Sequence, residues 1–536
     1  MNVCVERSAV RAGTNLLQCA NQAGVKIRSV CGGLGLCGKC AVRVLKGGEL
    51  LDQPTDAERR WLGEKLEEGF RLACQARVRG SGELELSVPP ESMEVREVSL
   101  LPRLEVQVEL EPNVRRTVLQ REGSVFTRVM RGGHPLAEEE GLREVLGVAL
   151  DLGTTNLVGY LLDLETGKVL STEALPNPQP GDDIMTRLTL SLQGSDLRGS
   201  LLSGIGELMR RLCGERRREV YEVVVVGNSV MHHFLFDLPL GSLTKAPFSP
   251  STLLAMDRPT REIGMDLPGW VYSPPLVGGF VGSDCVADVL ASRLWREREP
   301  WLLVDVGTNT EIVLSDGERM WACSCASGPA FEGGRLTCGR RAGEGAIWGV
   351  RLDEHLQPIL HVNGTPVGLC GSGAVDLLAE LVKRDAVSRD GRMVGEGERF
   401  REGRYGREFV IHGGVVLTQS DVRELQLAKA AVAAGIRVLM KQAGLELGDL
   451  SRLAIAGAFG VSLNVESATS IGMLPPAPEV IKLGHGAGLG AQLALLSTKE
   501  RRMAEELAGE IEHVPLAGRE DFRGWFLECM RLEPLA

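Results

Sequence analysis

Four cysteines near the N-terminus constrain the fold of this chain more than any other feature. Cys31, Cys37 and Cys40 lie within one ten-residue stretch, and Cys74 follows after 33 further residues. Glycine is the most frequent residue between the first three cysteines. Glycine tolerates the positive φ angles of a tightly curled loop, and such a loop can turn its backbone N–H groups inward. The pattern therefore predicts a loop that wraps around a metal centre.

The spacing of five and then two residues between the first three cysteines resembles the adrenodoxin and putidaredoxin branch of the 2Fe-2S ferredoxins. The resemblance implies that Cys31, Cys37, Cys40 and Cys74 bind a 2Fe-2S cluster, with two thiolates for each iron. It also implies a β-grasp ferredoxin-like domain over residues 1–90. Two alternatives remain, a set of buried reduced cysteines and a structural zinc site. Zinc sites usually combine two C-x2-C pairs, and only one is present.

The sequence around the cysteines agrees with a small domain of strands and helices. Residues 41–45 and 83–88 alternate between apolar and polar side chains, as half-buried strands do. Residues 15–24 predict a short helix that ends at Gly24, and residues 70–73 predict a strand that leads into Cys74. The spacing excludes Cys4 and Cys19 as ligands, and we expect both to be packing residues.

Length and composition narrow the range of functions. The 536 residues predict three or four domains or subdomains. The net charge of −11 argues against nucleic acid and anionic membrane surfaces as main partners. We find neither a signal peptide nor an uncharged apolar stretch long enough to span a membrane, and we expect a cytoplasmic protein. Thirteen cysteines are too few for a disulfide scaffold, so their clustering favours metal or redox chemistry.

The segment after the first domain predicts a boundary. Residues 88–98 are rich in proline and charge, which is typical of a linker. Residues 104–110 alternate as a strand does. We expect residues 91–145 to form a linker and a small middle segment, to which the sequence assigns no function.

Two later segments share one pattern, an apolar strand, then D-x-G-T, then a second apolar strand. The polar and glycine positions of the two turns are Asp151, Gly153, Thr154 and Thr155 in the first, and Asp305, Gly307, Thr308, Asn309 and Glu311 in the second. Two such turns that face each other can clamp a polyphosphate, while their carboxylates hold its Mg²⁺ through water. A plain β-hairpin is the alternative for either segment taken alone.

This repeat resembles the ATPase superfamily of acetate kinase, the sugar kinases, the heat-shock chaperones and actin. The resemblance implies an actin-like ATPase domain over residues 146–536, with RNase H-like halves at roughly 146–300 and 301–536. Gly457, Ala458 and Phe459 resemble the adenosine motif of the superfamily. A glycine-rich helix start resembles the connecting motif of the 2-hydroxyacyl-CoA dehydratase activators, and its residues are Gly371, Ser372 and Gly373. The P-loop signature is missing from the sequence. The whole chain is thus expected to be a multidomain α+β and α/β protein.

Over nearly its full length the chain resembles the reductive activators of corrinoid proteins. The resemblance rests on the fusion of a 2Fe-2S domain to this ATPase fold. It rests also on longer runs at residues 177–187, 226–235, 278–284, 326–333 and 421–429. It implies an ATP-dependent one-electron reduction of inactive cob(II)alamin to cob(I)alamin in a partner corrinoid protein of a methyltransferase system. The cluster then supplies the electron, Asp151 and Asp305 are catalytic, and the other hairpin and glycine-motif residues bind ATP with Mg²⁺.

The implied partners are a corrinoid protein, an upstream electron donor and a second copy of the chain. Residues 104–145 are shorter than the middle domain that the resemblance implies. Three other functions stay open. They are an ATP-driven electron donor to a different metalloenzyme, a ferredoxin carrier that does not hydrolyse ATP, and a sugar or acetate kinase.

Several other motifs have plainer explanations than a functional site. We expect His232 and His233 to be one packed and one hydrogen-bonded histidine rather than metal ligands. A second cysteine group, Cys323, Cys325 and Cys338, is expected to pack beside a strand. The glycines of residues 484–490 favour close helix packing over a phosphate-facing turn. The loop at residues 326–333 is either a structural turn or a surface that faces the corrinoid of the partner.

Overall fold

The computed structural model describes residues 2–5, 13–23, 25, 27–29, 31–80, 82–89, 92, 108–121 and 123–535. Most of the expected linker, the expected helix end at Gly24 and residues 104–107 lie outside these ranges. Residues 108–110 are not in a strand, although the alternation over 104–110 predicted one. Within the described ranges, no helix is both long and apolar enough to cross a membrane.

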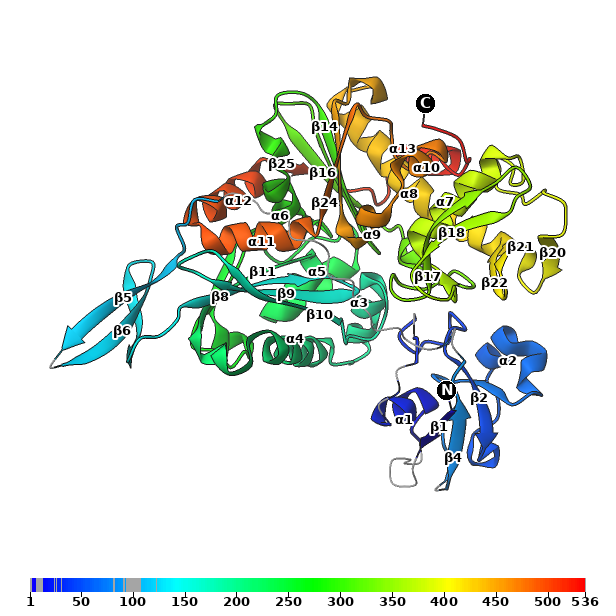
Figure 1. Cartoon of the computed structure of the whole chain (residues 1–536), viewed down its shortest axis with the longest axis horizontal. Coiled ribbons are helices and arrows are strands. Elements are labelled where there is room, and N and C mark those ends of the chain that lie inside the picture. The colour runs from blue at the N-terminus through cyan, green and yellow to red at the C-terminus, as the bar shows by residue number, and fades with distance from the viewer. Residues whose placement is uncertain are drawn as a thin grey trace.

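The N-terminal residues form a small domain around one sheet (Figure 1). Its described strands have the order β1-β4-β2-β3 and are β1 (Asn2–Val5), β2 (Ala41–Lys46), β3 (Phe70–Leu72) and β4 (Leu84–Ser87). The strands expected at 41–45, 70–73 and 83–88 are thus confirmed. Helices α1 (Leu16–Gln22) and α2 (Asp56–Leu62) each begin with a capping box, which satisfies the free N–H groups of the first turn. Apolar side chains of α1 and the inner strands form its core, among them Leu16, Val42 and Leu86.

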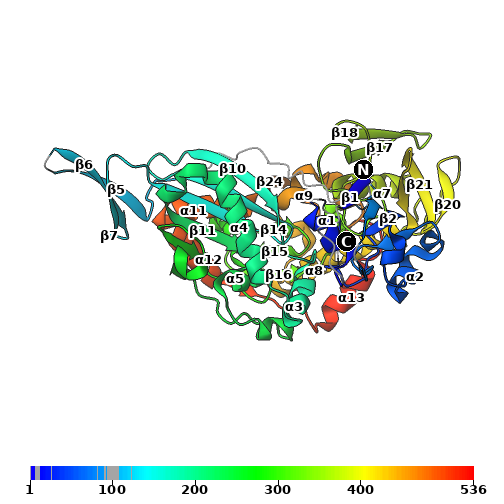
Figure 2. The same cartoon turned by 90° about the horizontal axis from the view of Figure 1, so that it is seen from below.

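A three-stranded antiparallel sheet follows and projects from the body (Figures 1 and 2). Its strands are β5 (Val114–Arg121), β6 (Ser124–Arg131) and β7 (His134–Glu140). Gly132 and Gly133 both have positive φ angles, as a tight turn between antiparallel strands requires. The sequence had suggested a small middle segment in this part of the chain without indicating these strands.

The rest of the chain is built on two six-stranded sheets with the same core topology. In each, three antiparallel strands are followed by two parallel ones, which gives the orders β10-β9-β8-β11-β13 and β16-β15-β14-β23-β24. The sixth strand is β12 beside β13 in the first sheet and β25 beside β16 in the second. The first sheet contains β8 (Leu146–Leu152), β9 (Asn156–Asp163), β10 (Val169–Pro176), β11 (Val220–Gly227), β12 (Met256–Pro259) and β13 (Trp270–Ser273). The second contains β14 (Trp301–Val306), β15 (Thr310–Ser315), β16 (Met320–Cys325), β23 (Arg452–Ala456), β24 (Glu479–Gly484) and β25 (Ile511–His513). The sequence repeat is therefore also a repeat of topology.

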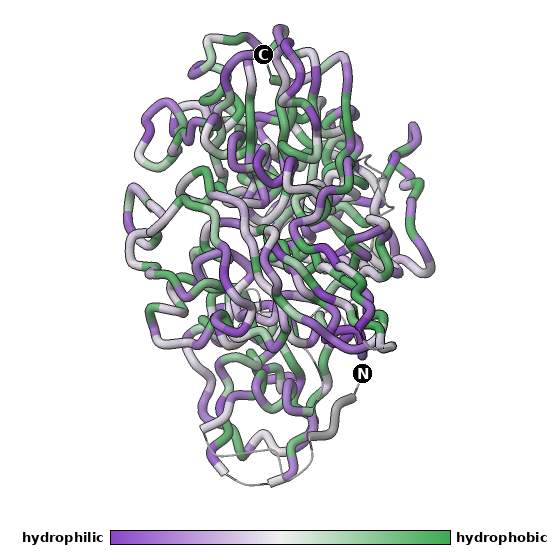
Figure 3. The backbone as a smooth tube through the Cα atoms, turned by 90° about the vertical axis from the view of Figure 1, so that its left-hand side faces the viewer, coloured by the Kyte–Doolittle hydropathy of each residue, from purple (hydrophilic) through white to green (hydrophobic). Residues whose placement is uncertain are grey.

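Two helices fill the space between the sheets. Helices α6 (Ser283–Ser292) and α11 (Gly486–Leu496) pack against each other and against strands of the sheets. A side chain at Gly490 would collide with the backbone of Ala287, and a Cβ at Gly488 would lie 2.8 Å from the Tyr160 ring. These glycines therefore serve close helix packing, as the sequence predicted. Hydrophobic stretches run through the body and alternate with hydrophilic ones (Figure 3).

Further helices cover the sheets. They are α3 (Ile184–Leu192), α4 (Leu197–Cys213) and α5 (Ser229–Phe236) in the first half, and α8 (Gln419–Ala443), α9 (Gly457–Ser462), α10 (Val465–Ser470), α12 (Thr498–Glu510) and α13 (Glu520–Glu528) in the second. Inserted between β16 and α8 is a lobe of β17 (Ala346–Leu352), β18 (Pro358–Val362), β19 (Gly368–Leu369), α7 (Gly371–Lys383), β20 (Phe400–Gly403), β21 (Gly406–His412) and β22 (Val415–Thr418). The N-terminal domain lies below this lobe in Figure 1.

Candidate functional site

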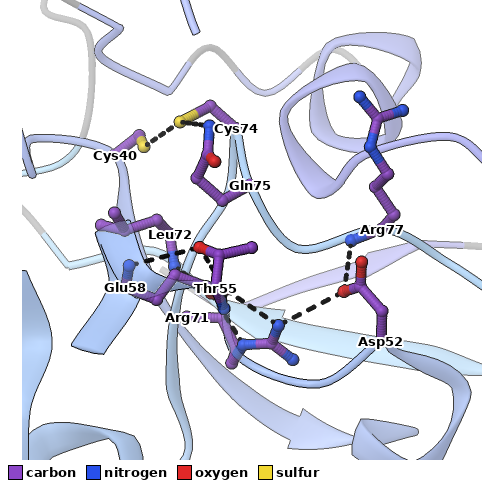
Figure 4. A network of polar contacts seen from close by, with 9 residues as sticks. All are labelled: Cys40, Asp52, Thr55, Glu58, Arg71, Leu72, Cys74, Gln75 and Arg77. Carbon is purple, nitrogen blue, oxygen red and sulfur yellow. Dashed lines mark hydrogen bonds and ion pairs between the residues drawn. The ribbon is translucent and has the colours of Figure 1, made fainter. Parts of the chain in front are cut away.

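The four N-terminal cysteines are arranged as two pairs. The Cys40 and Cys74 sulfurs are 3.3 Å apart, as Figure 4 shows. The thiol of Cys37 forms a hydrogen bond with Cys31, which is the main cause that lowers the pKa of Cys31 to about 5. In the part of the chain that the structure describes, no three His, Cys, Asp or Glu side chains are placed to hold one metal ion. Two pairs suit a centre in which each iron takes only two protein ligands.

The loop between the pairs is curled as its glycines predicted. Gly32, Gly33, Gly35 and Gly38 all have positive φ angles. The amide Nε2 of Gln75 donates to the Gly33 carbonyl at 3.0 Å, and the indole of Trp61 donates to the Gly35 carbonyl at 3.1 Å. Both side chains therefore hold the loop in its curled form.

Backbone N–H groups also point at the sulfurs. Those of Gly33, Leu36 and Cys37 contribute to lowering the pKa of Cys31, and that of Gly35 contributes to lowering the pKa of Cys74. The Gln75 amide adds a contact of 3.5 Å to the Cys74 sulfur. N–H donors of this kind stabilise thiolates, which are the form that binds iron. The donor set and its hydrogen bonds thus fit a 2Fe-2S cluster.

Both D-x-G-T turns lie at the ends of corresponding strands, and their tips meet. The hydroxyl oxygens of Thr155 and Thr308 are 3.3 Å apart. Glu332 bridges them, because its carboxylate accepts hydrogen bonds from Thr155 at 2.6 Å and from Thr308 at 3.1 Å. The sequence-predicted hairpins are thus brought face to face.

Neighbouring polar side chains hold the first tip. The Asn177 amide donates to the Gly153 carbonyl at 2.9 Å, and the Arg187 guanidinium donates to the Thr154 carbonyl at 2.6 Å. Asn228, at the start of α5, donates to the Thr154 hydroxyl at 3.1 Å. Two of these residues lie in runs that carried the family resemblance over 177–187, and the third lies in the run over 226–235.

Ser327 holds the second tip, since its hydroxyl contacts the Gly307 carbonyl at 3.1 Å and the Thr310 hydroxyl at 2.8 Å. Asn309 lies beside these residues in the turn and is partly buried. Glu311 points from β15 to the Ser324 hydroxyl, which donates to it at 2.9 Å. The turn is therefore rigid on the side away from the first hairpin.

A group of carboxyl side chains lies behind the two tips, formed by Asp151, Asp284, Asp288, Asp305 and Glu311. Burial raises the pKa of Asp305 to about 6 and that of Asp284 to about 7, with the Asp305 charge adding to the second shift. Burial and neighbouring carboxylates raise the pKa values of the other three well above their usual range. A hydrogen bond between Asp288 and Asp305 adds to the raised pKa of Asp288 and opposes the rise in the pKa of Asp305. Such a group favours the approach of a cation.

The two glycine motifs lie on either side of the Glu332 loop. A Cβ at Gly457 would lie 2.6 Å from a carboxyl oxygen of Asp305, so only glycine lets α9 begin this close to the second hairpin. The Phe459 ring is buried against Phe331, with 5.0 Å between the ring centroids. At the start of α7, a side chain at Gly371 would collide with the Phe331 carbonyl.

The other two residues of the α7 motif are used in packing. The Ser372 hydroxyl donates to the Trp348 carbonyl at 2.7 Å, and a side chain at Gly373 would collide with the Ile347 carbonyl. Ala458 lies at the start of α9 between Gly457 and Phe459. In the structure, the α7 motif thus positions the Phe331 loop and contacts neither hairpin tip directly.

A pocket of about 370 Å³ opens beside α9. Residues 461–465 form one wall, and Trp348 and His361 form the other. The indole of Trp348 is 41% exposed and packs on the His361 ring. Pockets of this size with an aromatic wall suit a small organic ligand.

Sequence reasoning missed Glu332 as a site residue, although it lies in a run that carried the resemblance. It also missed Asp284 and Asp288. Two acids four residues apart in the otherwise apolar helix α6 were a usable signal, because buried carboxyl groups are rare without a function. Nothing in the sequence pointed to Trp348, because its exposure is visible only in the structure.

The two histidines behave as predicted. His232 is buried, and neither of its ring nitrogens has a partner among the described residues. His233 is hydrogen-bonded at both nitrogens, to the Ser229 carbonyl at 2.7 Å and to Ser251 at 2.9 Å. Cys323 and Cys325 are buried on β16, as expected for packing residues. Cys19 is likewise buried in α1.

Polar contacts dock the N-terminal domain on the loop that follows Glu332. The Arg28 guanidinium donates to the Gly333 carbonyl at 2.9 Å and to the Gly339 carbonyl at 3.1 Å. Lys39 donates to the Leu336 carbonyl at 3.2 Å. Between the domains lies a cavity of about 610 Å³, lined in part by the charged residues Arg28, Lys39, Lys65, Asp182, Glu332, Arg340, Arg341 and Arg404.

Comparison with known proteins gives consistent matches along the chain. Residues 4–79 match the 2Fe-2S iron-sulfur cluster binding domain. Residues 146–297 match the RACo middle region, and residues 299–534 match the C-terminal domain of RACo, the ASKHA domain. The region that the family model calls the middle is therefore the first six-stranded half rather than the three-stranded sheet before it.

Individual proteins match over most of their length. The corrinoid activation enzyme RamQ of Eubacterium limosum is 30% identical, with 92% of each chain covered. A Co(II) methylated amine-specific corrinoid protein reductase of Methanosarcina barkeri is 25% identical, covering 71% of this chain and 76% of that protein. The solved structure of a reductive activator for corrinoid, iron-sulfur protein is 30% identical and superposes with a TM-score of 0.73, covering 97% of this chain and 96% of that one.

Proposed function

The chain belongs to the RACo family of reductive activators with a 2Fe-2S domain and an ASKHA ATPase domain, and we propose that it reduces cob(II)alamin to cob(I)alamin in a partner corrinoid protein at the expense of ATP. The observation that carries this proposal is the placement of the cysteine loop. The loop that holds Cys31 to Cys40 is docked beside the loop that closes the two hairpin tips. The ferredoxin-like domain and the proposed nucleotide site therefore contact the same loop, the one that contains Glu332.

In the proposed ATP site, the two hairpins bind the phosphates. The hydroxyls of Thr154, Thr155 and Thr308 and the backbone N–H groups around Gly153, Gly307 and Asn309 would bind the phosphates between the tips. Asp151 and Asp305 would hold Mg²⁺, directly or through water, with Glu311 close to them in the same group of carboxyl side chains. Mg²⁺ in such sites typically takes only one or two carboxylates besides phosphates and water, so a complete protein cage is not needed. Binding of the metal would also relieve the repulsion among the buried carboxyl groups.

We place the adenosine end beside α9. Gly457, Ala458 and Phe459 border it at the hairpin side, and the pocket next to Trp348 has room for a nucleoside. The α7 motif of Gly371, Ser372 and Gly373 supports the site indirectly, because it positions the Phe331 loop.

In the proposed cluster site, Cys31 and Cys37 hold one iron, and Cys40 and Cys74 hold the other. When bound, the cluster supplies one electron at a time to the cobalt of the partner. The chain orients the four sulfurs, directs N–H groups at them and limits water around Cys40 and Cys74, which are nearly fully buried. An upstream donor must return the electron after each transfer.

ATP is needed because the electron transfer is unfavourable. Plant-type clusters have potentials near roughly −400 mV, and the proposal places the cob(II)/cob(I) couple below this value. Hydrolysis can drive the step only if the chain binds its partner differently before and after it. Closure of the two halves around ATP gives the chain two such states.

The phosphate site is tested by replacing the hydroxyls at the tips. Thr155→Val and Thr308→Val should each weaken ATP binding by about tenfold or more, because a hydrogen bond to a charged phosphate contributes roughly 1.5–3 kcal/mol. Titration calorimetry on the cluster-loaded chain measures the binding. Thr117→Val, at an exposed position of β5, is the matched control and should bind ATP normally. Unchanged binding by both hairpin variants would show that ATP does not bind between the tips, and no binding by the unmodified chain would favour a carrier that does not use ATP.

A further inference from the structure

Glu332 occupies the position where the proposed function puts a phosphate. Its two carboxyl oxygens accept the hydroxyl protons of Thr155 and Thr308. Each hydroxyl has a single proton to donate. A bound phosphate and Glu332 therefore compete for the same two donors, and their negative charges repel each other. Nucleotide binding must displace the Glu332 side chain.

Displacement of Glu332 acts directly on the segment that holds the N-terminal domain. Glu332 ends the short helical turn Pro329–Glu332, and the next residue, Gly333, supplies the first carbonyl that Arg28 contacts. The second Arg28 contact, at Gly339, and the Lys39 contact, at Leu336, lie within the following seven residues. One short loop thus links the phosphate hairpins to the cysteine domain.

Both ends of this loop are held, so the movement is confined to its middle. Before Glu332, Phe331 is buried against Phe459. After it, the backbone N–H and the hydroxyl of Thr337 both donate to Asp421, at 2.7 and 3.0 Å. A shift of Glu332 is therefore absorbed mainly by residues 333–336.

The docked position covers one side of the cysteine loop. A Cβ at Gly32 would lie 2.7 Å from the Leu190 side chain and 3.1 Å from the Gly181 backbone nitrogen. Leu34 packs against the core of the first half. Gly32 and Leu34 both follow Cys31 within three residues, so a partner cannot approach the cluster from this side while the domain is docked.

From these contacts we infer that Glu332 is a nucleotide-sensing residue. With no nucleotide bound it joins the hairpins and keeps the ferredoxin-like domain docked. When the phosphates of ATP replace it, residues 333–336 shift, the Arg28 and Lys39 contacts weaken, and the cysteine loop becomes uncovered for the partner. The inference rests on the proposed ATP site and adds a link from that site to the electron carrier.

Hydrogen–deuterium exchange on the full, cluster-loaded chain tests this link without an electron-transfer assay. A nonhydrolysable ATP analogue with Mg²⁺ is the probe, and calorimetry on the same sample verifies that it binds. Binding should increase exchange in peptides that cover residues 31–40, 181–190 and 333–341. Peptides of β4, in the core of the same domain, should be unchanged and serve as an internal control.

Three variants separate a sensor from a merely structural residue. Glu332→Gln removes the charge and leaves a side chain of the same shape, so it should bind the analogue yet lose most of the increase in exchange. Arg28→Ala should show the high exchange without any nucleotide. Arg59→Ala removes an exposed arginine of α2 in the same domain and should behave as the unmodified chain does.

The outcomes distinguish the inference from the function on which it rests. Analogue binding without any change in these peptides would overturn the Glu332 link and leave the proposed function intact. A failure of the unmodified chain to bind the analogue would overturn both. An unaltered response in Glu332→Gln would show that the charge is not what triggers release.

Discussion

At the scale of single residues, Glu58 shows how a buried carboxylate supports the cysteine site. It is fully buried and accepts hydrogen bonds from Arg71 at 2.8 Å, from the Leu72 backbone at 3.1 Å and from the Thr55 backbone at 2.8 Å (Figure 4). These contacts tie α2 to β3, and β3 ends two residues before Cys74. The position of Cys74 therefore depends on this charge.

Glu58→Ala should destabilise the ferredoxin-like domain by about 3 kcal/mol, because breaking a buried ion pair leaves the other charge without its main partner. Arg71 would keep only a longer contact with Asp52, at 3.4 Å. Urea unfolding followed by the visible circular dichroism of the cluster measures the change. Glu83→Ala, which removes an exposed pair with Lys46, should cost less than about 1 kcal/mol. Equal effects of the two variants would contradict this account.

Asp182 makes stability depend on pH in the direction opposite to that of an ion-paired acid. Burial raises its pKa to about 6, against the opposing charges of Arg341 and Arg28, whereas an unfolded Asp titrates near about 3.9. Between these values the folded chain keeps a proton that the unfolded chain has lost. The folded state is therefore favoured at low pH, and this advantage is lost as the pH rises through about 6.

Asp182→Asn should remove this dependence. The variant and the unmodified chain should be equally stable near pH 4, and the variant should be more stable by at most about 3 kcal/mol at pH 7. Thermal unfolding midpoints of both proteins over this pH range provide the measurement. A variant that is less stable than the unmodified chain at pH 7 would show that the Arg28 and Arg341 contacts outweigh burial.

At the scale of elements, a buried charge network helps to attach the three-stranded sheet to the body, beside the apolar packing of Val114 and Val129. Arg131, at the end of β6, pairs with Glu222 at 2.8 Å and with Asp257 at 2.6 Å. Its guanidinium also lies 4.5 Å from the centre of the Trp270 ring. Glu222 is almost fully buried and contacts Arg501 as well, at 2.9 Å.

Arg131→Ala should loosen this sheet without unfolding the body, because Glu222 keeps Arg501 as a partner. We expect a loss of about 2 kcal/mol, the range of a hydrogen bond to a charged group. Hydrogen exchange should rise in peptides over 124–131 and not in β11. Arg121→Ala, which removes an exposed pair with Glu138 near the free end, is the control and should change little.

Elements could be predicted where the signal lies within one stretch of sequence. The D-x-G-T hairpins and the strands next to the cysteines carry their own periodicity and turn residues. The start of α8 also has a local signal, a capping box between Thr418 and Asp421. The β5–β7 sheet was not foreseen, because most of its side chains are exposed or half-exposed and its apolar alternation is weak.

At the scale of the whole molecule, the relation between the domains could not be predicted. Arg28 and Lys39 bind backbone carbonyls of the loop after Glu332, and carbonyl positions are not visible in a sequence. Glu332 was missed for a similar reason, because Thr155 lies 177 residues away from it and meets it only in the folded chain. The cysteine spacing and the two hairpins were visible because each is a local motif.

The proposed coupling of the ATP site to the cluster site is tested by mixing the chain with a corrinoid protein, its proposed substrate. A purified corrinoid protein in the cob(II) state would be followed by absorbance, with catalytic amounts of the cluster-loaded chain and a reductant, with and without Mg-ATP. Our account predicts rapid formation of cob(I) only with Mg-ATP, and loss of this activity in Asp151→Asn and Asp305→Asn. Reduction at the same rate without ATP, or none at all with several corrinoid proteins and an intact cluster, would contradict it.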